Sequence, residues 1–263
     1  MKPPSLPFST PKVSEYLCTP WIVSITEHHI LKSSGSERET FECALPLPGL
    51  PEMIFDKNSV SIMYNGNSTA TESRPYLSFT ALDALKMVDC TKITVEVPFA
   101  KEWQKARENT DEQLDQPKPY DWTFTTPYNG SLRGPWSVDN YAEGLDMSLL
   151  RRRDPILFYA ETTLFEDELG DNGISMLNIK LRVMETGFFL LQRFFLRVDG
   201  GLVRTFDTRI QWRKGDNYLI RNIRRAESSS WSPSMVGISL AQADAVCDRL
   251  LEEFSEKLTP CGL

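Results

Sequence analysis

Alternation of apolar and polar residues predicts β-strands in the second half of the chain. Residues 177–183 alternate Leu, Ile, Leu and Val with Asn, Lys and Arg, as in a strand with one buried face. Residues 188–198 are almost continuously apolar, which is typical of a central strand covered on both faces. Asp199-Gly200-Gly201 then predicts a hairpin turn into a strand over 202–210.

Weaker patterns extend this prediction to an α+β fold. Shorter strands are predicted at 21–31, 60–64, 92–97, 156–164 and 217–223. Thr80-x-x-Asp83 predicts a helix start before residues 84–88, and good helix formers after Pro98 predict a helix over 99–108. A third helix is predicted to begin at Ser239. Its apolar face would consist of Val246, Leu250, Leu251, Phe254 and Leu258. We expect mainly antiparallel sheet, or a sandwich, with packed helices.

Polar segments connect these elements but do not separate two hydrophobic blocks. They lie at 33–40, 65–75, 108–119 and 133–146. Residues 1–14 are rich in Pro and Ser and have no periodicity, so we expect a flexible N-terminal tail. The remainder, 15–263, is predicted to form a single domain.

Composition and charge narrow the class of protein. The 263 residues carry a net charge of −7, which argues against nucleic acid or an anionic membrane as the main partner. No apolar run reaches the roughly 18 residues of a membrane span, and the N-terminus lacks an apolar signal stretch. The five cysteines form no C-x-x-C pair, which indicates reduced thiols. We expect a protein of the cytoplasm, with the nucleus as a second compartment.

Catalytic and metal-binding signatures are sparse. His28 and His29 are adjacent, and on a strand they would point to opposite faces, so we expect no shared metal ion. Carboxylates cluster at 166–168 and Asp171, which suits a solvated turn or, alternatively, a carboxylate-dependent hydrolase using Glu166, Asp167 and Asp171. The residues therefore show no catalytic constellation and call for no cofactor or metal, which is compatible with a binding module.

Two arginines interrupt the most apolar run of the chain. Arg193 and Arg197 would be costly to bury unless they are paired. Asp207 and Asp199 are the nearest acids along the hairpin, so a structural ion pair is one interpretation and an anion-binding groove is the other.

The segment 117–128 (PKPYDWTFTTPY) places Tyr120 and Trp122 between prolines. Exposed Tyr and Trp beside rigid segments often form binding surfaces, and packing against the sheet is the alternative. Both aromatics are therefore candidate partner-binding residues.

A longer stretch, 118–130 (KPYDWTFTTPYNG), resembles the signature of the TIP-forty-one-like family, whose animal members are called TOR signalling pathway regulator-like proteins. Other segments match the family in order and spacing: 164–169, 171–173, 179–199 and 207–209. The resemblance extends from about Trp21 to about Leu250.

This resemblance implies a non-enzymatic regulator. Family members bind catalytic subunits of type 2A-class serine/threonine phosphatases, including the type 4 and type 6 relatives, engage the C-terminal tail and restrain activity. In fungi the family is tied to nutrient signalling through the TOR kinase and to the phosphatase-associated protein of that pathway. The family's partner-binding positions correspond to Asp83, Ile156 and Asp207, and Thr205 stands where animal members have Met. Asp83 would also stabilise its own helix start. We expect a monomer when the protein is free.

A tail carboxylate requires a fixed cation beside an apolar groove. Candidate anchors are Arg193, Arg197, Arg204 and Arg209, with Phe194, Phe206 and Ile156 as groove residues. Strand alternation puts Arg204 on the face opposite to Asp207 and Arg209. We therefore predict that Arg209, oriented by Asp207, binds the carboxylate. A carboxylate-dependent hydrolase is the alternative, and a small-ligand-binding sandwich is a third interpretation.

Overall fold

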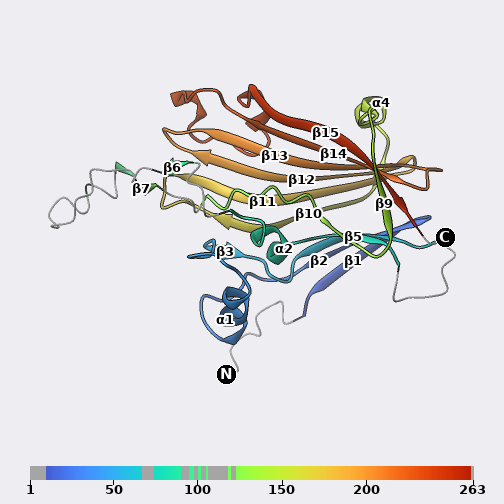
Figure 1. Cartoon of the computed structure of the whole chain (residues 1–263), viewed down its shortest axis with the longest axis horizontal. Helices are drawn as coiled ribbons and strands as arrows, with labels where there is room; N and C mark the ends of the chain where they lie inside the picture. The colour runs from blue at the N-terminus through green and yellow to red at the C-terminus, as the bar shows by residue number, and fades with distance from the viewer. Residues whose placement is uncertain are drawn as a thin grey trace.

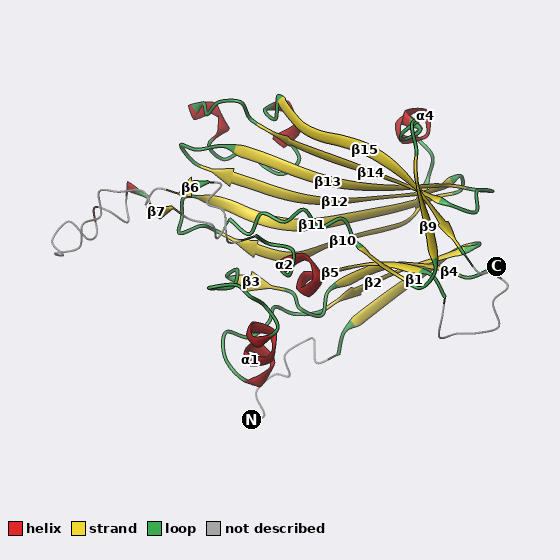
Figure 2. Ribbon diagram, in the orientation of Figure 1, coloured by secondary structure: helices red, strands yellow, loops and turns green. Residues whose placement is uncertain are grey.

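Two facing β-sheets, a small two-stranded sheet and a few short helices form the described part of the computed structural model (Figure 1). The structure describes residues 10–66, 74–89, 95–97, 100–101, 105, 118–119 and 123–261. Strands dominate over helices (Figure 2), so the predicted α+β fold with mainly antiparallel sheet is confirmed. Within the described ranges, none of the helices combines the length and apolar character needed to cross a membrane.

The larger sheet has the strand order β3-β10-β11-β12-β13-β14-β15-β9 within the described residues. Its long strands are β10 (Ile156–Asp167), β11 (Gly173–Met184), β12 (Gly187–Val198), β13 (Val203–Arg213), β14 (Leu219–Glu227) and β15 (Arg249–Pro260). The short edge strands are β3 (Met53–Ile54) and β9 (Trp136–Asn140). Neighbouring strands are antiparallel, and β12 lies in the interior of the sheet as predicted.

The hairpin between β12 and β13 fixes which side chains share a face. Gly200 in its turn has a φ of 82°, a left-handed conformation that glycine adopts readily. The register places Arg193 opposite Asp207, and Leu190 opposite Ile210. Because side chains alternate along a strand, these two pairs point to opposite faces of the sheet. The predicted hairpin is therefore confirmed.

The inner faces of the two sheets enclose the main apolar core. The smaller sheet has the order β1-β2-β4-β5-β8. Its strands are β1 (Lys12–Cys18), β2 (Trp21–Glu27), β4 (Ser59–Tyr64), β5 (Tyr76–Thr80) and β8 (Ser131–Arg133). Val23, Ile62 and Phe79 of this sheet share a core with Leu177 and Phe194 of the larger sheet, and all five are fully buried. Burial of each such side chain stabilises the fold by roughly 1.5–3 kcal/mol.

Short helices connect the strands. They are α1 (Ser36–Cys43), α2 (Ala81–Leu85), α4 (Met147–Arg151) and the 3-10 helices η2 (Pro233–Met235) and η3 (Ala243–Ala245). The predicted start of α2 is confirmed, because Thr80 Oγ1 accepts a hydrogen bond from the Asp83 N–H at 3.2 Å. Most of the predicted helix over 99–108 lies outside the described residues. The predicted strand over 92–97 is described only at its end, where β6 (Glu96–Val97) pairs with β7 (Lys118–Pro119).

The predicted helix after Ser239 is wrong. The segment begins with the single turn η3 and continues as β15, which pairs with β14 on one side and β9 on the other. The spacing of Leu250, Phe254 and Leu258 by four residues fits one face of a helix, but it equally fits one face of a strand. Phe254 and Leu258 lie opposite Ile223 and Leu219 of β14. The segment therefore forms a strand rather than a helix because it pairs with the free edges of β14 and β9.

Two predicted loops contain regular elements that depend on tertiary contacts. Helix α1 begins at Ser36 within the 33–40 segment and buries Phe41. Strand β9 lies within the 133–146 segment and gains its backbone partners from β15. In addition, β1 begins at Lys12, so residues 12–14 of the predicted tail pair with β2.

Candidate functional site

The outer face of the larger sheet, which points away from the smaller sheet, carries a buried ion network. Asp207 Oδ1 accepts a hydrogen bond from Arg193 Nε, and Oδ2 accepts one from Arg193 Nη2, both at 2.7 Å. Arg209 Nη2 also donates to Asp207 Oδ2, at 2.7 Å. Arg193 and Asp207 are 4% and 2% exposed, so this is an ion pair within the protein rather than on its surface. The predicted structural ion pair across the hairpin is confirmed.

The same network holds residues 228–248, here called the cover segment, against the outer face. Arg193 donates to the Leu240 carbonyl at 3.0 Å and to the Asp244 carboxylate at 2.9 Å. Arg197 donates to the Ile238 carbonyl at 3.1 Å and pairs with Asp199 at 3.0 Å. Met235, Ala243 and Cys247 of the cover segment pack on Phe195, Val203 and Ala226. Arg193 and Arg197, two of the four predicted anchors, therefore bind groups within the protein.

Opposing effects act on the pKa of Arg193. Burial alone would lower it, but the hydrogen bonds and charges of Asp207 and Asp244 outweigh burial and raise it above its ordinary value. Arg193 is therefore a permanent cation whose donors are committed to the fold.

Arg209 differs because its side chain remains 23% exposed. It lies in a groove, here called the Arg209 groove, of about 470 Å³. The lining residues are Asn140, Tyr141, Ala142, Gly144, Leu145, Met147, Arg209, Asn222, Glu253, Phe254 and Ser255. The hydrogen bond to Asp207 uses one of the five guanidinium N–H groups and fixes the orientation of the plane. The groove therefore offers an oriented cation beside apolar and aromatic side chains.

The segment 141–146 forms one wall of the groove because it is attached at both ends. The Tyr141 N–H donates to the Ser255 carbonyl at 2.9 Å. The Asp146 N–H donates to Gln211 Oε1 at 2.7 Å, and Gln211 Nε2 donates back to the Asp146 carbonyl at 3.1 Å. The segment therefore extends from β15 to β13, and its residues Tyr141, Gly144 and Leu145 line both the Arg209 groove and a second hollow.

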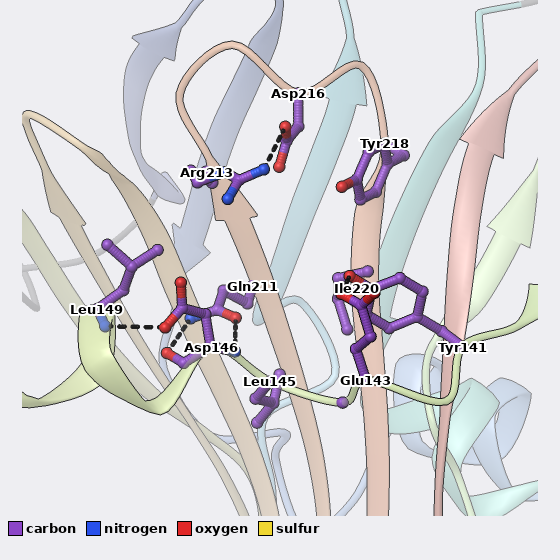
Figure 3. Close-up of a pocket in the computed structure, with 11 residues that line it drawn as sticks. Tyr141, Glu143, Leu145, Asp146, Leu149, Gln211, Arg213, Asp216, Tyr218 and Ile220 are labelled. Carbon is purple, nitrogen blue, oxygen red and sulfur yellow. Dashed lines mark hydrogen bonds and ion pairs between the residues drawn. The ribbon is translucent and has the colours of Figure 1, made fainter.

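Figure 3 shows the second hollow, which is lined by Asp146, Gln211 and Arg213 among others. Its charged side chains have partners within the protein, and Asp146 accepts hydrogen bonds from the N–H groups of Ser148 and Leu149. Arg213 lies 3.2 Å from Asp216, and the Tyr141 hydroxyl donates to Glu143 at 2.9 Å, which is the main reason why the pKa of Tyr141 rises to about 12. Both arginines are paired, but Arg213 is 56% exposed whereas Arg209 is 23% exposed and is oriented by a buried carboxylate, so the Arg209 groove is the better candidate site.

Other predicted site residues lie elsewhere. Ile156 is 55% exposed at the start of β10. Across the sheet it lies level with Arg213, which is six residues from Asp207 along β13, so Ile156 and Asp207 are separated by about 20 Å in the strand direction. Asp83 lies on the side of the smaller sheet, where its Oδ2 accepts a hydrogen bond from Ser131 Oγ at 2.7 Å. Thr205 is buried beneath the cover segment. Tyr120 and Trp122 lie outside the described residues.

The prediction that Phe194 and Phe206 line the groove is wrong. Phe194 and Phe206 pack against each other on the inner face, with ring centroids 5.9 Å apart. Arg204 shares that face as predicted and pairs with Glu227 at 2.8 Å. Phe194 and Phe206 alternate with Arg193 and Asp207 along their strands, so they cannot line a groove on the outer face.

The second half of the 118–130 motif packs under the larger sheet. Gln192 Nε2 donates to the Tyr128 carbonyl at 2.6 Å, and Arg221 donates to the Asn129 carbonyl at 3.4 Å. Phe124 is 2% exposed, and Thr126 Oγ1 donates to the Ala84 carbonyl at 2.7 Å. Residues 123–130 therefore serve packing.

The carboxylate cluster forms part of a turn. Asp167 is buried, and its two oxygens accept hydrogen bonds from the N–H groups of Leu169 at 2.7 Å and Glu52 at 3.1 Å. Glu168 and Asp171 are exposed, as expected for a solvated turn, but the burial of Asp167 departs from that prediction. In the part of the chain that the structure describes, no three His, Cys, Asp or Glu side chains are grouped to hold a metal ion.

The two histidines do not point to opposite faces. Strand β2 ends at Glu27, so alternation no longer applies, and the rings of His28 and His29 lie 3.9 Å apart between centroids. The His28 N–H donates to Asn58 Oδ1 at 2.6 Å. Burial, followed by the charge of His29, lowers the pKa of His28.

Several residues of the site gave no signal in the sequence. Asn222 and Ser255 reach the Arg209 groove only through the pairing of β13, β14 and β15. Asp244 joins the ion network from a segment predicted to be helical. A register of the whole sheet would have been needed to find them.

Comparison with known proteins places this arrangement in a family. A model of the TIP41-like family matches residues 53–232. The TIP41-like protein of Homo sapiens is 37% identical over 255 residues, covering 92% of this chain and 90% of that protein. The "Type 2A phosphatase activator TIP41" of Saccharomyces cerevisiae is 39% identical over 224 residues, covering 79% of this chain and 61% of that protein. The "Type 2A phosphatase activator tip41" of Schizosaccharomyces pombe is 33% identical, with 80% of each chain covered. The chain therefore belongs to the TIP41-like family.

Proposed function

We propose that this protein is a non-enzymatic regulator that binds the catalytic subunit of type 2A-class serine/threonine phosphatases. Two fungal relatives are named as type 2A phosphatase activators, which supports a role in phosphatase regulation. The proposal includes the type 4 and type 6 relatives and the phosphatase-associated protein of the TOR pathway as partners. It places this role in TOR nutrient signalling, in the cytoplasm and the nucleus.

The proposed binding mode is capture of the subunit's C-terminal tail in the Arg209 groove. The observation that carries it is the guanidinium of Arg209, which Asp207 orients and which remains part-exposed inside a groove. A guanidinium with free N–H groups suits a carboxylate, and prior orientation reduces the freedom lost on binding. Met147, which is 52% exposed at the groove, offers apolar surface to the side chains before the carboxylate.

The proposed effect is restraint of phosphatase activity. A regulator that holds the tail is positioned beside the catalytic subunit and can limit its access to substrates. The fungal names point to activation instead, so the sign of the effect must be measured.

The test uses recombinant chain with a type 2A catalytic subunit, either intact or lacking its C-terminal tail. We expect the intact subunit to bind and to turn over a phosphopeptide more slowly, and we expect tail removal to weaken binding at least tenfold. Absence of binding at micromolar concentration would refute the proposal. Binding with increased turnover would retain the partner and reject restraint.

The Arg213→Ala variant provides a matched control for Arg209→Ala. Arg213 lies on the same strand and face as Arg209, but its side chain is 56% exposed and lines the other hollow. Only the Arg209 variant should lose affinity for the intact subunit.

A further inference from the structure

Asn222 lies on the floor of the Arg209 groove and is 5% exposed. Its Nδ2 donates to the Phe254 carbonyl at 3.3 Å and to Ser255 Oγ at 3.0 Å. Its Oδ1 has no hydrogen-bond partner among the described residues. A buried acceptor without a donor is unfavourable, so the free protein holds an acceptor that a ligand can satisfy.

The orientation of this amide is fixed by its neighbour. The Phe254 carbonyl can only accept a hydrogen bond, so it requires the amide nitrogen on its side. Exchanging the nitrogen and oxygen of Asn222 would set two acceptors against each other. The oxygen of Asn222 is therefore the atom without a partner.

Arg209 and Asn222 are direct cross-strand neighbours on β13 and β14. Such neighbours have Cβ atoms about 4.5–5.5 Å apart and point to the same face. One supplies charged donors and the other supplies an acceptor, so together they suit a ligand that carries a carboxylate and an N–H a few ångströms apart. The last residue of a peptide has this chemistry.

We infer that Asn222 is a specificity-determining residue, whose Oδ1 accepts the backbone N–H of the ligand's C-terminal residue while Arg209 binds the α-carboxylate. This inference rests on the proposed function and adds a second point of recognition to it. Oδ1 is enclosed in the free chain beside the part-exposed Arg209. The ligand N–H reaches Oδ1 after a small displacement of the groove side chains that enclose it, while Asp207 keeps Arg209 oriented.

Two-point recognition distinguishes a chain end from a simple carboxylate. A side-chain carboxylate of Asp or Glu satisfies Arg209 but carries no N–H at the same separation. Glu253 on the groove wall adds negative charge, which disfavours both kinds of carboxylate alike, so the second hydrogen bond distinguishes between them.

The experiment compares two synthetic peptides of the phosphatase tail by calorimetric titration. In one peptide the last amide is replaced by an ester, which removes the N–H and keeps the carboxylate. A third peptide carries the ester three residues earlier and controls for the change in backbone chemistry. Wild-type protein should bind the amide peptide about 5- to 20-fold more tightly than the terminal ester, and the earlier ester should bind like the amide.

Two variants assign the effect to Asn222. Asn222→Leu should bind the amide and the terminal ester equally, at the affinity of the wild type for the ester. Ser255→Ala removes a partner of Nδ2 but leaves Oδ1, so it should retain the preference for the amide. Equal affinity of wild-type protein for both peptides would overturn the inference and leave the proposed function standing. Failure of wild-type protein to bind either peptide would overturn both.

Discussion

Arg193 and Asp207 face each other on β12 and β13 and form a bidentate ion pair with two N···O distances of 2.7 Å. Both side chains are almost completely buried, and Arg193 also holds the cover segment through Leu240 and Asp244. Family resemblance implies a partner-binding role for Asp207. The geometry shows that Asp207 has a structural role, because it neutralises the charge of Arg193 and orients the side chain of Arg209.

Breaking this pair should therefore destabilise the protein. Arg193→Met should lower the free energy of unfolding by about 3–5 kcal/mol, because it leaves the Asp207 carboxylate buried with less compensation. Urea unfolding measures this change. The exposed pair of Arg213 with Asp216 is the comparison, since Arg213→Met should cost no more than about 1 kcal/mol. Equal effects of the two variants would contradict the structural role.

Asp83 should contribute to stability without affecting tail binding. Its carboxylate accepts from Ser131 Oγ on the side of the smaller sheet, away from the Arg209 groove. Asp83→Ala and Ser131→Ala remove the same hydrogen bond, so each should lower stability by about 1 kcal/mol and leave tail-peptide affinity unchanged. If Asp83→Ala alone weakens binding of the whole catalytic subunit, Asp83 contacts the partner directly.

Asp167 should be a structural residue. Asp167→Ala leaves the N–H groups of Leu169 and Glu52 without their acceptor, which should cost about 1–3 kcal/mol. Glu168→Gln, at an exposed neighbouring position, should change stability by less than 0.5 kcal/mol, as is usual at the surface. Thermal unfolding gives both values. If the Asp167→Ala variant folds but binds the tail peptide more weakly, the turn around Asp167 belongs to the interface with the phosphatase.

Alkaline pH should destabilise the protein through buried acidic groups. Burial raises the pKa of the Cys18 thiol from 9.0 to about 11, and it raises the pKa of Tyr128 from 10.0 to about 12. The folded state disfavours the ionised forms of both groups. The free energy of unfolding should therefore be unaffected by them below pH 9, and it should fall as the pH rises from 9 to about 12. Cys18→Ala should reduce the loss between pH 9 and 11, whereas exposed Cys43→Ala should not. An identical pH profile for both variants would contradict this assignment.

The central hairpin could be predicted from the sequence, because the local pattern of residues there matches the strand pairing in the sheet. Residues 177–183 alternate, Gly200 permits the turn, and the two-residue spacing of Asp207 and Arg209 places them on one face. The shared face of Arg193 and Arg197 followed from the same rule. These features need only the alternation of a strand.

Other features depend on contacts that sequence spacing cannot reveal. Leu250, Phe254 and Leu258 satisfy the periods of both helix and strand, and the free edge of β14 selects the strand. Asn222 enters the groove because β14 pairs with β13 in one particular register. The inward direction of Phe206 follows from alternation, but assigning it to the core requires knowing which face the smaller sheet covers.

Binding of the tail carboxylate by Arg209 is tested by a calorimetric titration of the phosphatase tail peptide against wild-type protein, Arg209→Ala and Arg213→Ala. We predict that Arg209→Ala folds normally and loses about 1.5–3 kcal/mol of binding free energy, the scale of a charge-assisted hydrogen bond, while Arg213→Ala binds like the wild type. Amidation of the peptide C-terminus should weaken wild-type binding by a similar amount, and the two losses should not add. Unchanged affinity of folded Arg209→Ala, or losses that add fully, would contradict the assignment of Arg209 as the anchor for the tail carboxylate.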